Sequence, residues 1–279
     1  TSFSDYIESG AIGDIDNDGL LDDIVVSYVF NSSETRMGVW NTSDGLTWHH
    51  LWNKSIYETG TAEAYETIIG DFDRDGYKDD MVNVLGWGDN STVFDDVGNA
   101  LYHTSDASFS LLAIDLNHDG FEDEIIFGGQ GNAYAYRWNG TYDSSYVFGD
   151  RIFTRTEVVR RVREIGKIDL DSDGWTDDFI LADEGGDNLG PAKIWAYDND
   201  SNLIWNYTVP DFGITDEDII HSMSIEDVDD DGSDDIVFST DNLDIVWALN
   251  KSGDLLFYHK IGLGDIGFEN GVSPGIDIS

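Results

Sequence analysis

The stretch Asp14-Ile-Asp16-Asn-Asp18-Gly19-Leu-Leu-Asp22 decides the fold, because the chain repeats its pattern four more times. Side chains with oxygen donors occupy positions 1, 3, 5 and 9, which is the donor set that a hard cation such as Ca²⁺ requires. Gly at position 6 tolerates a positive φ and so permits the bend that turns positions 1, 3 and 5 toward one point. The other copies are Asp71-Phe-Asp73-Arg-Asp75-Gly76-Tyr-Lys-Asp79, Asp115-Leu-Asn117-His-Asp119-Gly120-Phe-Glu-Asp123, Asp169-Leu-Asp171-Ser-Asp173-Gly174-Trp-Thr-Asp177 and Asp227-Val-Asp229-Asp-Asp231-Gly232-Ser-Asp-Asp235.

We therefore expect about five bound Ca²⁺ ions, one in each copy. Acidic clusters of this density repel one another when no cation neutralises them, so calcium is expected to be a structural requirement. The predicted side-chain ligands are Asp14, Asp16, Asp18 and Asp22; Asp71, Asp73, Asp75 and Asp79; Asp115, Asn117, Asp119 and Asp123; Asp169, Asp171, Asp173 and Asp177; and Asp227, Asp229, Asp231 and Asp235.

An EF-hand begins with the same spacing, but it needs a bidentate Glu at position 12 and a helix on each side. Residues rich in β-branched and aromatic side chains flank the copies instead, as in Thr67-Ile-Ile-Gly70 before the second and Ile24-Val-Val-Ser-Tyr-Val-Phe30 after the first. Position 12 is apolar in every copy: Val25, Val82, Ile126, Ile180 and Phe238. Each loop therefore joins two strands, and the EF-hand is rejected.

The loops begin about 44 to 58 residues apart, and an internal repeat of this length indicates a propeller or a solenoid. The first repeat contains four predicted strands, at 6–13, 23–30, 36–41 and 46–53. The third repeat contains predicted strands at 108–114, 124–128 and 133–138, followed by an irregular stretch to residue 150. No segment has a sustained apolar period of 3.6 residues, so little helix is expected.

Four-stranded units of this size are the blades of a β-propeller. We therefore expect an all-β chain in which residues 1–279 form a single β-propeller domain of five four-stranded blades, with a calcium loop between the first two strands of each. The repeats span approximately residues 1–57, 58–105, 106–155, 156–212 and 213–265.

The repeated loop resembles the FG-GAP repeat of integrin α-subunit propellers and of related bacterial and archaeal surface proteins. Outer hairpins such as Val39-Trp-Asn-Thr-Ser-Asp-Gly-Leu-Thr-Trp48 resemble the repeats of pyrroloquinoline-quinone-type propellers. The resemblance implies that main-chain carbonyls at position 7 complete the sites, namely those of Leu20, Tyr77, Phe121, Trp175 and Ser233. The Phe-Gly and Gly-Ala-Pro signatures of the repeat are degenerate here, and Asn117 removes one charge from the third site. Such repeats occur in adhesion proteins, lyases and secreted modules, so the resemblance defines no single function.

Residues 266–279 follow the fifth repeat and include Gly271-Val-Ser-Pro-Gly-Ile-Asp-Ile-Ser279, which resembles the start of an inner strand. This segment would close the ring, or be donated to the open sheet edge of a neighbouring molecule, or mark a truncated sixth unit. The sequence favours none of the three.

The net charge of -43 excludes nucleic acid as a partner, because phosphate binding needs a basic surface. A salt-rich habitat and a surface layer bathed in divalent ions would each suit this acidity. The chain has no cysteine, so it holds neither a disulfide nor a thiolate metal site. No run of about 18 apolar residues is present, so no membrane span is expected. The first residue is Thr rather than Met, which is consistent with a removed leader peptide and equally with a truncated start.

The sequence contains eight Asn-x-Ser/Thr sequons, more than its content of Asn, Ser and Thr would produce by chance. Four of them share one hairpin turn of the repeat, where Asn and Ser are ordinary turn residues. Glycosylation, and hence export, is the preferred interpretation. The eight predicted acceptors are Asn31, Asn41, Asn53, Asn90, Asn139, Asn199, Asn206 and Asn250.

Five of the eight arginines lie between Arg151 and Arg163, where they would either pair with local carboxylates or dock an acidic ligand. The six histidines lack the spacing of a zinc site, and no nucleophile elbow, P-loop or dinucleotide-binding fingerprint is present. We therefore predict no catalytic residues and no organic cofactor.

The preferred hypothesis is a secreted protein with a structural or adhesive role at the cell surface, as a subunit of an extracellular filament or surface layer. Its partners would be other protein subunits, further copies of itself or cell-surface glycans. The alternative is a carbohydrate-binding or polysaccharide-cleaving propeller, a lectin or a lyase, that uses the central face.

Overall fold

The computed structural model describes residues 6–30, 34–42, 47–57, 63–86, 91–104, 107–138, 150–158, 160–185, 190–210, 219–240 and 245–261. These residues form twenty strands in five four-stranded antiparallel sheets and contain no helix. The predicted fold class is therefore confirmed: the protein is an all-β propeller built from four-stranded blades. Because the described residues contain no helix, none of them forms a helix that could cross a membrane.

The blades follow the order of the sequence. Blade 1 contains β1 (Tyr6–Gly13), β2 (Asp23–Phe30), β3 (Glu34–Asn41) and β4 (His49–Tyr57). Blade 2 contains β5 (Ala64–Gly70), β6 (Asp80–Leu85), β7 (Thr92–Phe94) and β8 (Ala100–His103). Blade 3 contains β9 (Ser108–Ile114), β10 (Glu124–Gly129), β11 (Ala133–Arg137) and β12 (Asp150–Arg155). Blade 4 contains β13 (Val162–Ile168), β14 (Asp178–Asp183), β15 (Lys193–Tyr197) and β16 (Leu203–Thr208), and blade 5 contains β17 (Ile220–Glu226), β18 (Asp235–Thr240), β19 (Ile245–Asn250) and β20 (Leu255–Lys260).

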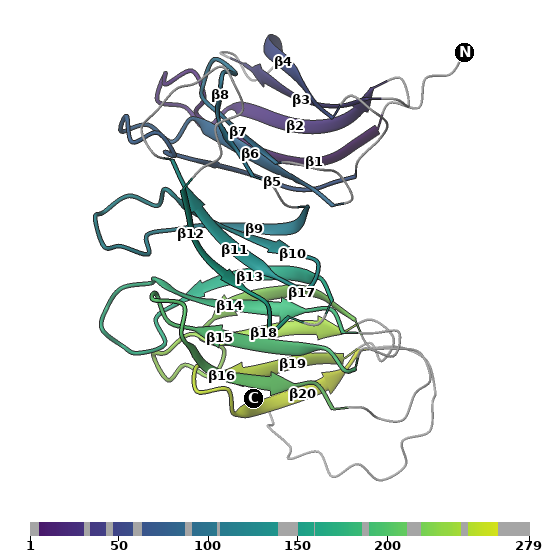
Figure 1. Cartoon of the computed structure of the whole chain (residues 1–279), viewed down its shortest axis with the longest axis vertical. Coiled ribbons are helices and arrows are strands. Elements are labelled where there is room, and N and C mark those ends of the chain that lie inside the picture. The colour runs from purple at the N-terminus through teal and green to yellow at the C-terminus, as the bar shows by residue number, and fades with distance from the viewer. Residues whose placement is uncertain are drawn as a thin grey trace.

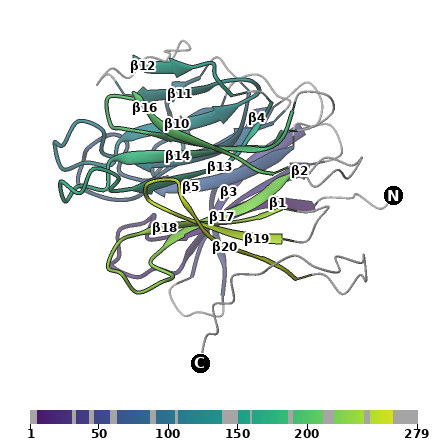
Figure 2. The ribbon, with the colours of Figure 1, turned by 90° about the horizontal axis from the view of Figure 1, so that it is seen from below.

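The first strand of each blade packs against the first strand of the next, in the order β1, β5, β9, β13 and β17. Blade 1 lies at the upper end of the molecule in Figure 1, and blades 4 and 5 lie at the lower end. Figure 2 looks along this series of sheets from below. Residues 266–279, for which ring closure, strand donation and a truncated sixth unit are the three alternatives, lie outside the described residues.

Strand β12 is the fourth strand of the third repeat, for which the sequence indicated only three strand ranges; the predicted irregular stretch before it lies largely outside the described residues. Its sequence, Asp150-Arg-Ile-Phe-Thr-Arg155, carries little apolar alternation because most of the strand is exposed at the outer edge of blade 3. Pairing with β11 holds it in place, and the ring of Phe153 stacks on Phe179 of blade 4 at 5.4 Å. The strand is thus stabilised by contacts that are distant in the sequence. The last strand of blade 1 is also displaced from its predicted position, since β4 begins at His49 and runs to Tyr57.

The hydrophobic core is divided among the interfaces between consecutive blades. We call the side of a blade that meets the preceding blade its front face and the side that meets the following blade its back face. The strands β6, β10 and β14 are buried on both faces, because each lies in a blade with a neighbour on either side. In β2 the buried and half-buried residues alternate, because the other described residues cover its back face far more than its front face.

Two tryptophans fasten the outer strand of one blade to the next blade. Trp52 of β4 donates its indole N–H to the carbonyl of Asp96 at 2.7 Å, and Trp205 of β16 donates to the carbonyl of Lys251 at 2.9 Å. Both rings cover a glycine with positive φ in the turn that they contact, Gly98 and Gly253. A Cβ at Gly253 would lie 2.7 Å from the ring of Trp205, so that turn requires glycine for space as well as for conformation.

Candidate metal sites

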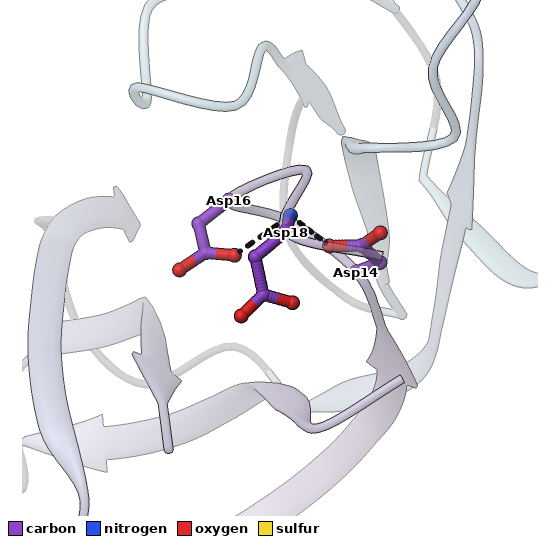
Figure 3. Close-up of side chains that lie close together, drawn as sticks. All are labelled: Asp14, Asp16 and Asp18. Carbon is purple, nitrogen blue, oxygen red and sulfur yellow. Dashed lines mark hydrogen bonds between the residues drawn. The ribbon is translucent and has the colours of Figure 1, made fainter. Parts of the chain in front are cut away.

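The five acidic loops join the first strand of each blade to the second. In the first loop, the backbone N–H of Asp18 donates to Asp14 at 3.0 Å and to Asp16 at 3.3 Å (Figure 3). The backbone N–H of Gly19 also donates to Asp14, at 2.9 Å. The backbone thus wraps around the carboxylates and holds them in place. Two residues with positive φ form each bend, at position 4 and at the Gly of position 6. In the first loop these are Asn17 (φ 58°) and Gly19 (φ 89°).

Three carboxylates converge in four of the loops, with one oxygen from each lying within 4.8 Å of the others. The clusters are Asp14, Asp16 and Asp18; Asp71, Asp73 and Asp75; Asp169, Asp171 and Asp178; and Asp227, Asp229 and Asp231. In the third loop Asn117 occupies position 3, and its amide donates to Glu124. Convergent carboxylates with solvent access suit a hard divalent cation, so these residues fit the expected metal.

The electrostatics of the second loop show what a cation would relieve. Partial burial raises the pKa of Asp71, and its neighbours Asp75 and Asp73 raise it further, while N–H donors from the backbone oppose the shift. A divalent ion bound among these three groups would reverse the sign of the local field and favour the ionised carboxylates. The geometry supports metal binding without specifying which divalent ion binds.

The aspartates at position 9 lie mainly between blades. Asp79 accepts from the amide of Asn17 at 2.6 Å, and Asp123 accepts from Arg74 at 2.7 and 2.8 Å. Asp177 contacts His118 through a hydrogen bond that raises the pKa of the imidazole. Each donor is the position-4 residue of the preceding loop. A role for these carboxylates as calcium ligands stays a prediction, as does the role of the position-7 carbonyls.

We call this repeated contact the inter-loop clasp: the position-4 side chain of one loop binds the position-9 carboxylate of the next. Arg74 also lies over the ring of Phe121 at 5.6 Å, and the His118 ring stacks on Trp175 at 4.9 Å. Because consecutive loops touch in this way, loops 1 to 4 lie side by side on one edge of the propeller. Sequence reasoning considered the histidines only as possible zinc ligands and so missed the clasp.

A second carboxylate closes the base of each loop, and sequence reasoning missed it. Asp23 accepts from the backbone N–H of Ile15 at 2.6 Å, and Asp80 accepts from that of Phe72 at 2.7 Å. Glu124, Asp178 and Asp235 accept the equivalent bond in the other three loops. The fifth loop is one residue shorter, and for this reason Asp235, predicted as a position-9 ligand, makes the closing bond. The adjacent acid pairs, such as Asp79-Asp80, carried this signal in the sequence.

The predicted glycosylation sites among the described residues fall into two groups, those with exposed side chains and those with half-buried side chains that lie within hydrogen-bond distance of other residues. Asn53 on β4 and Asn206 on β16 are exposed on the outermost strands of their blades. The amide of Asn41 instead donates to Asp16 at 2.6 Å, and that of Asn199 lies 3.2 Å from His118. The side-chain oxygen of Asn250 accepts two N–H groups of its own turn. The remaining predicted acceptors, Asn31, Asn90 and Asn139, lie outside the described residues.

The arginine-rich segment is satisfied by local partners. Arg160, Arg161 and Arg163 surround Glu184, with N–O distances of 3.4, 3.7 and 2.8 Å. Arg151 donates to the hydroxyl of Tyr136, and Arg155 donates to the hydroxyl of Ser201 at 2.6 Å. These contacts favour the interpretation that the arginines stabilise the propeller over the one in which they dock an acidic ligand.

A second feature lies among the first strands of blades 2 to 5, at their opposite ends from the acidic loops. A cavity of about 290 Å³ is lined by Tyr65, Glu66, Phe109, Arg163, Glu164 and His221. Burial raises the pKa of Glu164 to about 7, and the neighbouring Glu66 contributes to the shift against an opposing effect of Arg163. Burial also raises the pKa of Glu66, which accepts the backbone N–H of Leu111 at 2.8 Å.

The raised pKa of Glu164 predicts a loss of stability as the pH rises. Between its ordinary value of 4.5 and about 7, the folded protein holds a proton that the unfolded chain has released. Stability therefore falls as the pH rises through this window. Glu164→Gln keeps the shape and removes the charge, so its melting temperature should exceed that of the parent at pH 8 and match it at pH 4.5. Glu226→Gln, at an exposed site on β17, is the control, and its melting temperature should differ from that of the parent by the same small amount at both pH values. A difference in melting temperature between Glu164→Gln and the parent that is the same at pH 4.5 and pH 8 would contradict this prediction.

Comparison with known proteins supports the fold alone. No family model matches the chain, and no curated protein matches its sequence significantly, so the resemblance to integrin-type calcium repeats stays a prediction. Among solved structures, the protein is similar to Sqt1 of Saccharomyces cerevisiae, with a TM-score of 0.59 and 11% identity over 87% of this chain and 60% of that one. It is similar to the Vibrio cholerae biofilm matrix protein Bap1, with a TM-score of 0.57 and 16% identity over 94% of this chain and 41% of that one.

A Lactobacillus plantarum protein is also similar, with a TM-score of 0.60 and 11% identity over 89% of this chain and 69% of that one. These neighbours place the chain among the β-propellers. The chain spans about 60% of the length of the first of these neighbours and less than half that of Bap1.

Proposed function

We propose that this protein is a secreted, calcium-stabilised β-propeller with a structural or adhesive role at the cell surface, as a subunit of an extracellular filament or surface layer. The observation that carries the proposal is the convergence of three carboxylates at four of the five loops, where Asp178 takes the place of Asp173 in the fourth. Exposed oxygen sites of this kind in extracellular modules bind calcium with dissociation constants on the order of 10⁻⁴ to 10⁻³ M. Such sites fill at the millimolar calcium found outside cells and stay largely empty in the cytosol.

Two further observations support the location. Asn53 and Asn206 are exposed on outermost strands, where a glycan would meet no neighbouring blade. One protein of similar fold, Bap1, is a biofilm matrix protein. The likeness in fold is compatible with an extracellular role, although it carries no information on partners.

Immunogold labelling of intact cells of the source organism tests the proposal. The expected result is label on the outer surface without permeabilisation, and release of label by a wash with EDTA. Label that appears only after permeabilisation would overturn the extracellular role. Loss of a mass shift on PNGase F treatment in the variant carrying both Asn53→Gln and Asn206→Gln would identify the glycosylated sites.

A cavity on the loop edge favours the alternative of carbohydrate binding. Its volume is about 510 Å³, and residues of loops 2, 3 and 4 line it. The rings of Phe121 and Trp175 are 38% and 47% exposed at its wall, and Lys78 and Glu122 offer polar contacts. Exposed aromatic rings beside polar groups are a common way to hold a sugar ring. Incubation with acidic oligosaccharides tests this alternative. Cleavage of the oligosaccharide would indicate a lyase, and binding without cleavage would indicate a lectin.

A further inference from the structure

The first strand of every blade contains a β-bulge near its beginning, away from the acidic loop that follows the strand. In β5 the pairing with β6 steps from Ala64 to Glu66, so Tyr65 is an extra residue in the ladder. A bulge bends the strand and redirects a side chain, and bulges are common beside active sites. The extra residues of the five first strands lie at equivalent positions and are Glu8, Tyr65, Phe109, Arg163 and His221.

Four of these extra residues line the cavity of about 290 Å³ described above, which we call the bulge cavity. Its wall consists of Tyr65, Glu66, Phe109, Arg163, Glu164 and His221. Tyr65 and Glu66 are consecutive, and a regular strand would direct such neighbours to opposite faces. The bulge brings both to the cavity, and it does the same for Arg163 and Glu164. The backbone feature repeats in every blade but the side chains at it differ, so the wall is asymmetric and suits one particular ligand.

Two carboxyl groups at this cavity have spare capacity to accept hydrogen bonds. Glu66 accepts the backbone N–H of Leu111 at 2.8 Å. Glu164 is half-buried and makes no hydrogen bond with the residues that the structure describes. Arg163 offsets the charge of Glu164 only in part, because its Nε donates to Glu184 at 2.8 Å. A group that donates hydrogen bonds and carries positive charge would relieve the repulsion between Glu66 and Glu164.

The wall favours an organic ammonium group over a metal ion. Among the described residues, every cluster that could hold a metal ion lies at an acidic loop, at the opposite end of the strands. An ammonium group instead needs separate acceptors for its three N–H donors. Tyr65 and Phe109 form the apolar part of the wall, where their rings meet edge to face with 5.2 Å between centroids. Aromatic rings beside carboxylates suit a cation that is attached to carbon atoms. The net charge of -43 also attracts cations to the protein.

We propose that the bulge cavity binds the primary ammonium group of a small organic ligand. Glu164 and Glu66 accept N–H donors from the ammonium. The rings of Tyr65 and Phe109 contact the carbon atoms next to it. The cavity volume is at the lower limit for small-molecule sites, so it fits a single small amine or one lysine side chain of another protein. This site goes beyond the surface role proposed above and does not depend on it.

A ligand-observed NMR titration tests the proposal, with n-butylamine and Nα-acetyl-lysine amide as probes. The titration is run at about pH 8, where Glu164 is mostly ionised and both amines carry a proton. Salt at about 150 mM screens general attraction to the acidic surface. Both probes should bind saturably, and Nα,Nε-diacetyl-lysine amide, which has no charge, should not bind. Binding of n-butylamine alone would identify the ligand as a free amine, and binding of the lysine derivative alone would identify it as a lysine side chain.

Two variants locate the binding in the bulge cavity. Glu164→Gln should raise the dissociation constant for the probes by at least about tenfold, because the ammonium loses a charged hydrogen-bond acceptor. Glu66→Gln should have a similar effect, and its amide oxygen can still accept the N–H of Leu111. Unfolding would not explain the loss, since Glu164→Gln is expected to melt above the parent at this pH. Glu226→Gln removes an equal charge from an exposed site near the other end of β17 and should leave the dissociation constant unchanged.

Several results would overturn the proposal. Binding that weakens as much in Glu226→Gln as in Glu164→Gln would show general attraction to an acidic surface. Equal binding of the diacetylated compound would show that the charge is not recognised. Absence of binding by both amines to the folded parent would show that the cavity does not take an ammonium group. None of these results bears on the cell-labelling test of the surface role, so the two proposals fail separately.

Discussion

Removal of divalent cations with excess EDTA is expected to lower the melting temperature by on the order of 20 °C. With dissociation constants on the order of 10⁻⁴ M, calcium at about 10 mM is present at about 100 times its dissociation constant and stabilises the folded state by about 2.7 kcal/mol per site. Four clusters of three converging carboxylates would together contribute roughly 11 kcal/mol, and about 2 °C is lost for each kcal/mol in a domain of this size. The measurement is a thermal melt followed by circular dichroism, in calcium, in EDTA and after calcium is restored.

A single substitution shows whether the effect arises in the loops. Asp229→Asn retains the oxygen that accepts the N–H of Asp231 and removes one of the three charges of the fifth cluster. The variant should be less stable than the parent in calcium and slightly more stable in EDTA, because the remaining carboxylates then repel each other less. Asp254→Asn, outside the loops, should show no such change of sign. An unchanged melt of the parent in EDTA would refute a structural role for the metal.

Glu184→Ala is expected to destabilise the protein by about 3 to 5 kcal/mol, which is the usual effect of removing one partner from a buried ion pair. Glu184 is 2% exposed and pairs with three arginines, which would lose the countercharge that they share. Arg161 also contacts blade 3, since it lies over the ring of Phe109 in β9 at 5.1 Å. The expected fall in melting temperature is roughly 10 °C.

A matched substitution separates this effect from a general loss of surface charge. Glu157 is 41% exposed and pairs with Arg155 at 4.0 Å, so Glu157→Ala should change the free energy of unfolding by no more than about 1 kcal/mol. Glu184→Gln retains an oxygen that accepts hydrogen bonds but removes the charge. Its free energy of unfolding should therefore lie between those of Glu184→Ala and Glu157→Ala. If Glu184→Ala and Glu157→Ala have the same melting temperature, the ion pairs between the arginines and Glu184 do not stabilise the protein as proposed.

The strand pattern of the repeats could be predicted because its causes are local. Strands β1 and β2 have the predicted bounds, since a Gly-containing acidic bend separates two β-rich runs. Strand β12 could not be predicted, because β11 and the ring of Phe179 hold it, and neither lies close to it in the sequence. The convergence of Asp14, Asp16 and Asp18 followed from spacing alone, whereas the inter-loop clasp of Arg74 and Asp123 joins loops that are 49 residues apart.

The sequence by itself determined that this is an all-β protein of repeated four-stranded units with clustered carboxylates in every repeat, because the bends and alternations act over a few residues. Only the tertiary structure decided which carboxylates join neighbouring loops and which close the base of a loop, and that three arginines share Glu184. Those features depend on which blades lie side by side, and packing between distant segments sets that arrangement.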